Sequence, residues 1–359
     1  MTGARIPLWS LAWPAFGWVM LAAAFFLGSQ GPIAALAGIA LLATVFAAVY
    51  HAEVVAHRVG EPFGTLILAL AVTVIETALI VSVMIAAPAE NTGLARDTVF
   101  AAVMIVCNGI VGICLLLGGA RHHEQGFQIQ GASAALAVLA ALTGLALILP
   151  NYAASELGPS YNQSQLIFAG LVSLVLYGSF VFVQTVRHRD YFLPTQDDDH
   201  GAYGPPPPGK TAALSAGLLL VSLSAIIGLA KFLTPSVELG IAHLGMPKAV
   251  VGIIIAALVL LPEGLAALNA AQRNRLQTSL NLALGSALAT IGLTIPAVAA
   301  VSIVIGQPLA LGLEAKEQVL LALTLLIGVI TLGTGRTTVL QGIVHLVFFA
   351  VFLFFAMVP

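Results

Sequence analysis

Two glutamates lie deep within apolar stretches of the sequence, where a carboxylate is costly. Glu76 is the only charged residue of TLILALAVTVIETALIVSVMIAA (65–87), and Glu263 is the only one of VVGIIIAALVLLPEGLAALNAA (250–271). A charged side chain at the centre of a bilayer costs several kcal/mol and usually faces a partner or a cavity. The alternative is structural, with each glutamate protonated and hydrogen-bonded to a neighbouring helix.

The chemistry expected of such a pair is an exchange of protons for a cation. No Lys or Arg lies deep in an apolar stretch to neutralise either glutamate, and we interpret His345 as a core histidine. Two carboxylates that share a site repel each other and burial disfavours their charge, so the pair should hold a proton near neutral pH. Carboxylate oxygens also suit hard cations such as Ca²⁺. Competition between protons and a cation for the same oxygens predicts antiport.

Neutral oxygens near the two glutamates could complete a cation site. Pro262 precedes Glu263 and should disrupt its helix, which would free backbone carbonyls, although a simple kink is the alternative. Hydroxyl and amide oxygens could come from four further residues, which could equally serve as hydrogen-bonding links between helices. These residues are Thr73, Asn108, Asn281 and Ser286.

The elements that position these residues must be transmembrane helices. The chain has 359 residues, of which 60% are hydrophobic and 8% charged, whereas soluble proteins carry about a quarter charged residues. The apolar runs have the length of about 20 residues that crosses a bilayer, and they lack the alternation of barrel strands. We predict an all-α integral membrane protein with about eleven transmembrane helices, at 8–28, 32–51, 63–87, 98–119, 131–150, 165–186, 211–233, 247–270, 277–305, 318–334 and 338–357.

The basic residues predict the orientation. Eleven spans put nine of the thirteen Lys and Arg residues on the face of the N-terminus and the other four on the opposite face. The excess of positive charge marks the cytoplasmic face. We therefore expect a bacterial inner-membrane protein with a cytoplasmic N-terminus and a periplasmic C-terminus. The first apolar run, from about Leu8 to Leu27, is interpreted as a retained helix because no clean cleavage site follows it.

The chain divides into two halves around one polar segment. Residues 187–210, RHRDYFLPTQDDDHGAYGPPPPGK, form a predicted acidic, proline-rich cytoplasmic linker. We predict an extra N-terminal helix within 1–30, one five-helix repeat at 31–186 and a second at 211–359. The helix of Glu76 starts inside and that of Glu263 starts outside, so the repeats are inverted. Inverted repeats are typical of secondary transporters that bind substrate at the midplane.

Other functional classes find less support. The HAEVVAH stretch (51–57) lacks the spacing of a zinc-protease helix, and DDDH (197–200) is interpreted as a solvated acidic loop. No Gly-rich phosphate-binding loop is present, so ATP-driven pumping is unsupported. A channel would need a continuous polar pore, and a membrane-embedded enzyme would need a second metal-binding cluster. We expect no enzyme activity, no cofactor and no nucleic-acid partner.

Two segments carry a family resemblance. GEPFGTLILALAVTVIETALIVSVM (60–84) and LPEGLAALNAAQRNRLQTSLNLALGSALATIGLTIP (261–296) resemble the ChaA-type antiporters of the cation/calcium exchanger superfamily. The resemblance implies alternating access with Glu76 and Glu263 as the central pair. It also implies that Asn108-Gly109 and Gly285-Ser286 line the site, and that the helices at about 32–51 and 211–233 slide as gates.

The cation is left open by one departure from the family pattern. Many exchangers carry a Gly-Asn pair just before each key glutamate, where this chain has Val72-Thr73 and Val259-Leu260. We expect Ca²⁺/H⁺ exchange, with Na⁺ or K⁺ in exchange for H⁺ as the alternative. The expected partners are the lipid bilayer, the cations and protons, and the sequence leaves open whether the chain forms a homo-oligomer.

Overall fold

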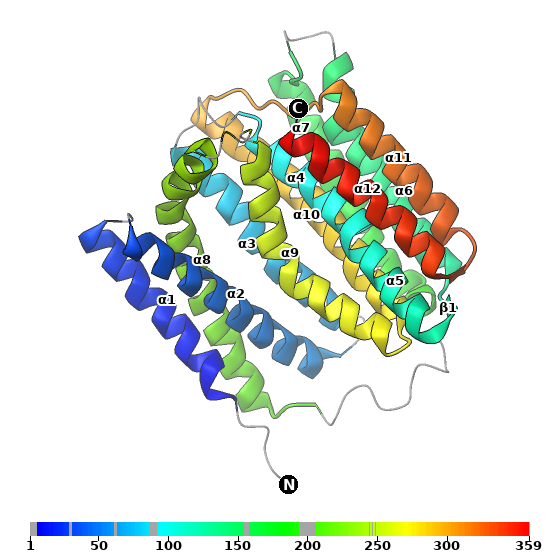
Figure 1. Ribbon diagram of the computed structural model, residues 1–359, viewed down its shortest axis with the longest axis horizontal. Helices are drawn as coiled ribbons and strands as arrows, with labels where there is room; N and C mark the ends of the chain where they lie inside the picture. Colours follow the sequence, from blue (N-terminus) through cyan, green and yellow to red (C-terminus); the bar gives the residue numbers. More distant parts are fainter. Residues whose placement is uncertain are drawn as a thin grey trace.

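The computed structural model is a bundle of long helices that run side by side and share two common end faces (Figure 1). It describes residues 6–28, 31–60, 63–86, 92–153, 158–193, 206–243, 245, 247 and 249–358, so that DDDH (197–200) lies outside the described residues. Its elements are α1 (Leu8–Leu27), α2 (Pro32–Val59), α3 (Phe63–Ala86), α4 (Leu94–Met104), the π-helical turn η1 (Ile105–Ile110), α5 (Val111–His122), β1 (Gln125–Gly126), α6 (Ile129–Thr143), η2 (Gly144–Ile148), η3 (Leu149–Tyr152), α7 (Gln163–Phe182), η4 (Val183–Arg187), η5 (Arg189–Tyr191), α8 (Gly209–His243), α9 (Ala249–Gln272), α10 (Leu276–Ile305), α11 (Ala315–Leu332), β2 (Arg336–Thr337) and α12 (Val339–Met357).

The predicted spans are confirmed as helices. Within the described residues, nine helical segments are long and apolar enough to cross a membrane, with α4, η1 and α5 joined into one of them. Helix α9 is a tenth, bent by 52° between Val250–Leu261 and Glu263–Gln272. Because α9 is otherwise one helix from Ala249 to Gln272, the bend at Pro262 has the form of a kink, which was the alternative to a disrupted helix. Helix α3 occupies the remaining position and has 24 residues. Helix α8 continues to His243, ten residues beyond its predicted end, because a helix satisfies its own backbone outside the hydrocarbon as well as within it.

Contacts between connections define the two end faces. Strands β1 and β2 pair antiparallel, with Gln125 opposite Thr337, so the α5–α6 and α11–α12 connections share one face. Asn281, near the start of α10, donates to the Phe192 carbonyl that follows α7, which places the start of the linker on this face too. We call it the linker face. On the opposite face, the Ala310 amide donates to the Thr92 carbonyl over 3.1 Å.

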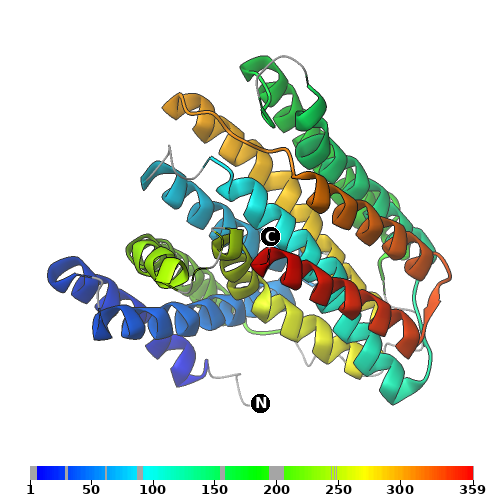
Figure 2. The same ribbon diagram turned by 45° about the horizontal axis from the view of Figure 1, so that its top comes forward.

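The helix neighbours repeat between the two halves. Helices α2 and α8 pack against each other, and α1 lies against both. Helix α3 contacts α10 much as α9 contacts α4, and α7 lies along α10 as α12 lies along α5. Figure 2 shows α12 beside α5, with α9 next to them. These pairs therefore recur between the two halves.

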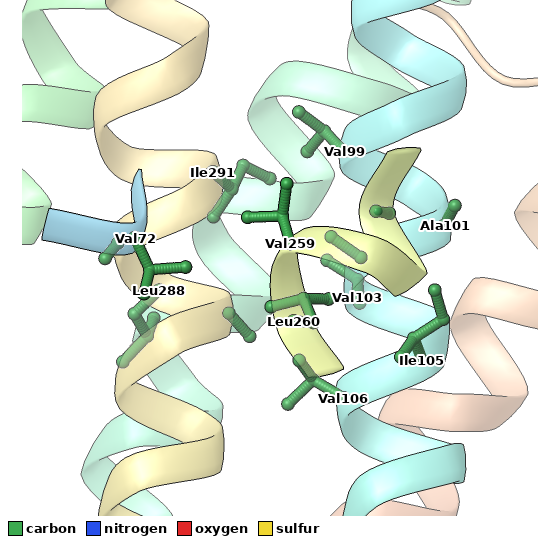
Figure 3. Close-up of a cluster of buried hydrophobic side chains, with 14 of the residues drawn as sticks. Val72, Val99, Ala101, Val103, Ile105, Val106, Val259, Leu260, Leu288 and Ile291 are labelled. Carbon is green, nitrogen blue, oxygen red and sulfur yellow. The ribbon is translucent and has the colours of Figure 1, made fainter. Parts of the chain in front are cut away.

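Apolar side chains surround the bend of α9. Figure 3 shows Val259 and Leu260 of α9 between Leu288 and Ile291 of α10 on one side and Val103 of α4 on the other. All five side chains are buried. Close packing leaves few voids in such a cluster, so the helices that carry the two glutamates are held against α10 and α4.

Candidate functional site

A stripe of hydroxyl groups on α10 brings the two predicted glutamates together. Ser286 and Thr290 are one turn apart on α10, and both are buried. The Ser286 hydroxyl donates to Glu263 Oε2, and the Thr290 hydroxyl donates to Glu76 Oε2 over 2.6 Å. Four helical residues rise about 6 Å, so α3 and α9 deliver their carboxylates to neighbouring positions on one face of α10.

The second oxygen of each carboxylate, Oε1, is buried and has no hydrogen-bond partner among the described residues. Glu76 and Glu263 are 0% and 1% exposed. The two side chains are also near enough to interact electrostatically. Leaving a charged oxygen buried and unpaired costs more than a hydrogen bond gains, so this arrangement favours binding of a proton or a cation at both atoms.

The polar stripe continues toward the opposite face. Thr294 lies one turn beyond Thr290 on α10, and its hydroxyl is 2.9 Å from the hydroxyl of Thr77, the residue after Glu76. The stripe on α10 therefore supplies three successive hydroxyls, of which two contact the carboxylates. Three-residue clusters of His, Cys, Asp or Glu are absent from the part of the chain that the structure describes. The site thus rests on two carboxylates and neutral oxygens.

Three further residues predicted for the site, Thr73, Asn281 and Gly285, have other contacts in the fold. Thr73 is buried on α3 and donates to the Ala69 carbonyl over 2.9 Å, within its own helix. Asn281 lies toward the linker face, where its Oδ1 accepts from Gln277. Gly285 lines a small cavity between α6, α7 and α10. None of the three makes a hydrogen bond to either glutamate among the described contacts.

Asn108 and Gly109 lie in the π-helical turn η1 and contact helices α11 and α12. Asn108 Nδ2 donates to Thr324 Oγ1 over 2.8 Å, and its Oδ1 lies 3.2 Å from His345 Nδ1. Gly109 lies against the Phe349 ring, which a Cβ at this glycine would meet at 3.3 Å. The structure thus brings Glu76, Glu263 and Ser286 together, while the Asn108 side chain is bonded elsewhere.

Thr290 is the site residue that sequence reasoning missed. Its hydroxyl contacts Glu76, yet in the sequence it is one of many threonines in apolar helices. The signal that could have found it is its spacing: a residue four positions after Ser286 lies on the same face of a helix.

A family model for sodium/calcium exchanger proteins matches the chain twice, at residues 31–186 and 214–358. The chain is 52% identical over 362 residues to the "putative ionic transporter y4hA" of Sinorhizobium fredii, covering 99% of this chain and 98% of that protein. It is 37% identical over 321 residues to the "sodium-potassium/proton antiporter ChaA" of Escherichia coli, covering 89% of this chain and 87% of that one.

Solved structures of membrane exchangers share the fold. The structure of native YfkE matches with a TM-score of 0.74 at 16% identity, covering 98% of this chain and all of that one. The H⁺/Ca²⁺ exchanger CAX matches with a TM-score of 0.75 at 17% identity, covering 96% of this chain and 87% of that one. The matched segments span most of both halves, and on this ground the chain belongs to the sodium/calcium exchanger protein family.

Proposed function

We propose that the chain is a secondary antiporter that exchanges Ca²⁺ for protons across a bilayer, with Glu76 and Glu263 binding either in turn. The observation that carries the proposal is the pairing at α10: each buried carboxylate has one oxygen bonded to a hydroxyl and one oxygen without a partner. Family membership supports transport rather than enzyme chemistry.

The donor set suits a hard cation. Two carboxylates offer four oxygens, and the hydroxyls of Ser286 and Thr290 offer two more. Ca²⁺ takes six to eight oxygens. One Ca²⁺ or two protons would neutralise the two negative charges equally, so the occupied site is neutral in either form. A site that crosses between the two faces only when neutral couples the two fluxes, because the doubly charged form is too costly in a low-dielectric interior.

A monovalent cation is the alternative substrate. The 37% identical relative is named a sodium-potassium/proton antiporter, whereas two of the similar solved structures, YfkE and CAX, are named Ca²⁺/H⁺ exchangers and others are of a sodium-calcium exchanger. Thr73 and Leu260 lack the amide that many exchangers place before each key glutamate. With Na⁺ or K⁺, the second carboxylate would retain a proton to keep the site neutral.

The two repeats would supply the alternating access. The double match of one family model supports repeats near the predicted boundaries, 31–186 and 211–359, with α1 as the extra helix. We infer that α2 and α8, which pack against each other beside the carboxylate helices, are the gating elements. The excess of basic residues predicts that the linker face is cytoplasmic and the membrane the bacterial inner membrane.

Exchange is tested in inverted membrane vesicles that hold an imposed proton gradient, read with a pH-sensitive dye. Adding Ca²⁺, Na⁺ or K⁺ separately should dissipate the gradient only with the transported cation, and Glu76→Gln and Glu263→Gln should abolish the response. Full activity in both variants would contradict the carboxylate mechanism. Cation flux without proton movement would identify a channel instead.

A further inference from the structure

A second group of buried polar side chains lies beside the carboxylate site, on the far side of η1. It consists of Asn108 of η1, Thr324 and Thr331 of α11, and His345 of α12, and we call it the Asn108 cluster. Asn108 Oδ1 lies 3.2 Å from His345 Nδ1, and His345 Nε2 lies 3.2 Å from Thr331 Oγ1. All four side chains are buried.

The hydrogen bonds of the cluster form one consistent chain. Thr331 donates to His345 Nε2, His345 Nδ1–H donates to Asn108 Oδ1, and Asn108 Nδ2 donates to Thr324. The Thr324 hydroxyl then donates to Met104 Sδ over 3.4 Å. Every side-chain nitrogen and oxygen of Asn108 and His345 therefore has a partner, as expected of a core histidine.

The cluster holds an unusual piece of backbone. Residues Ile105–Ile110 form a π-helical turn between α4 and α5, and Asn108 lies within it. The corresponding stretch of the other half, around Ser286, is continuous α-helix from Leu276 to Ile305. π-Helical turns are rare and occur frequently at functional sites. His345 bonds the side chain of Asn108, so it contacts this turn directly.

The same turn packs against the residue that follows Glu263. A methyl group on Gly264 would lie only 3.2 Å from Ile110 Cδ1, so the last residue of η1 is closely packed on the α9 backbone at this point. This is where α9 is bent by 52°. A shift of η1 would therefore move the segment that directs Glu263 toward Ser286.

We propose that Asn108 and His345 are positioning residues: their hydrogen bond holds η1 in its π-helical form, and η1, through Ile110 and Gly264, holds Glu263 where it accepts from Ser286. Neither residue touches the cation. The inference deepens the proposed function and rests on it, because the quantity that the two residues set is the affinity of the Glu76–Glu263 pair.

Two isosteric replacements of His345 separate its two hydrogen bonds. An asparagine amide occupies the place of the Nδ1 atom, and a glutamine amide reaches the place of the Nε2 atom. His345→Asn therefore keeps the bond to Asn108, and His345→Gln keeps the bond to Thr331 instead. We expect His345→Gln and Asn108→Leu to raise the half-saturating cation concentration of purified, reconstituted protein by about three- to twentyfold, the range expected for one hydrogen bond between membrane helices. His345→Asn should stay near the wild type, and turnover at saturation should change little in all three.

Two further variants test whether the effect on affinity comes from the Asn108–His345 hydrogen bond: a double variant and a control at Asn151. Asn108→Leu combined with His345→Gln should be no weaker in affinity than either single variant, since both remove the same bond. Asn151 donates to the Leu313 carbonyl near the opposite face, so Asn151→Leu should lower the melting temperature without changing affinity. Equal affinities of the His345→Asn and His345→Gln variants would overturn the proposal, as would a fall in melting temperature with unchanged affinity.

A readout independent of transport keeps the two proposals apart. Dicyclohexylcarbodiimide modifies buried carboxyl groups, and its rate of reaction with Glu263 can be followed by mass spectrometry. The rate should change at least twofold in His345→Gln and remain at the wild-type value in His345→Asn. Absence of cation/proton exchange in the wild type would contradict the proposed function but not the positioning role. Identical modification rates in both variants would contradict the positioning role but not the proposed function.

Discussion

The Thr290 hydroxyl donates a 2.6 Å hydrogen bond to Glu76 Oε2 and so joins two residues that are 214 positions apart in the chain. One turn earlier on the same helix, Ser286 does the same for Glu263. Helix α10 of the second half therefore supplies a hydroxyl to the glutamate of each half. The two halves repeat their helices, but their contributions to the site differ, since Asn108 and Gly109 of the first half face α11 and α12.

Removing the Thr290 hydroxyl should weaken cation binding. Thr290→Val keeps the shape of the side chain but leaves Glu76 Oε2 without its donor, and a hydrogen bond to a charged group contributes about 1.5–3 kcal/mol. We expect at least about a tenfold rise in the half-saturating cation concentration, measured by dye-based exchange in vesicles, and recovery in Thr290→Ser. Thr143→Val is the matched control, because the Thr143 hydroxyl bonds only carbonyls of its own helix. Equal effects of the two valine variants would contradict a role for Thr290 in the site.

Neutralising either glutamate should stop exchange while the protein still folds. Glu76→Gln and Glu263→Gln each remove a negative charge and a proton-binding oxygen, and glutamine can still accept from the α10 hydroxyl. We expect loss of exchange by about a hundredfold or more and a monodisperse gel-filtration profile in detergent, since removal of a buried unpaired charge does not destabilise the fold. Exchange that survives at half the wild-type rate in either variant would exclude a two-carboxylate site.

Acid should weaken cation binding in a way that reports the number of protons displaced. Protons and the cation compete for the same carboxylate oxygens, so a fall in pH raises the half-saturating cation concentration. The expected slope is about tenfold per pH unit if one proton leaves and about a hundredfold if both leave. Initial exchange rates in proteoliposomes clamped at several pH values on both sides measure it. A half-saturating concentration that is independent of pH would show that protons and cation bind at different places.

Two substituted cysteines should report the orientation. Arg336 and Lys316 are exposed on the linker face and the opposite face, respectively. In intact cells, a membrane-impermeant maleimide should label Lys316→Cys and leave Arg336→Cys unlabelled, with the reverse pattern in inverted vesicles. The native Cys107 and Cys114 are buried and should give no background. Labelling of Arg336→Cys in intact cells would show that the orientation is the reverse of the predicted one.

Adding a methyl group where α12 packs against α5 should destabilise the protein. A methyl group on Gly342 would lie 2.7 Å from Leu116 Cα and 2.9 Å from the Gly112 carbonyl oxygen. Because both are backbone atoms, Gly342→Ala must push the helices apart, and we expect a loss of about 1–3 kcal/mol of stability. The measurement is the melting temperature in detergent. Gly178→Ala, whose added Cβ would meet nothing within 4 Å outside its own stretch of helix, should leave the melting temperature unchanged or raised.

The sequence by itself determined the membrane class and the positions of the long apolar helices, and it singled out Glu76 and Glu263 as the carboxylates within them. These depend on quantities that can be read along the chain: the length of the apolar runs and the cost of a carboxylate within them. Glu76 and Glu263 stand out because almost no other charge interrupts an apolar helix. A bend in α9 was also predictable, because proline removes a backbone donor wherever it occurs.

Only the tertiary structure decided which neutral groups contact the carboxylates. A hydroxyl or amide in a transmembrane helix bonds whichever helix it faces, and small rotations of a helix change that partner. Thr290 and Ser286 face the glutamates because α10 lies between α3 and α9, whereas Asn108 is turned toward α11 and α12 in the π-helical turn η1. One inserted residue in a helical turn rotates a side chain by about 100°. Such a rotation leaves no mark in hydrophobic periodicity, and so the sequence placed Asn108 beside the carboxylates while the fold bonds it to His345.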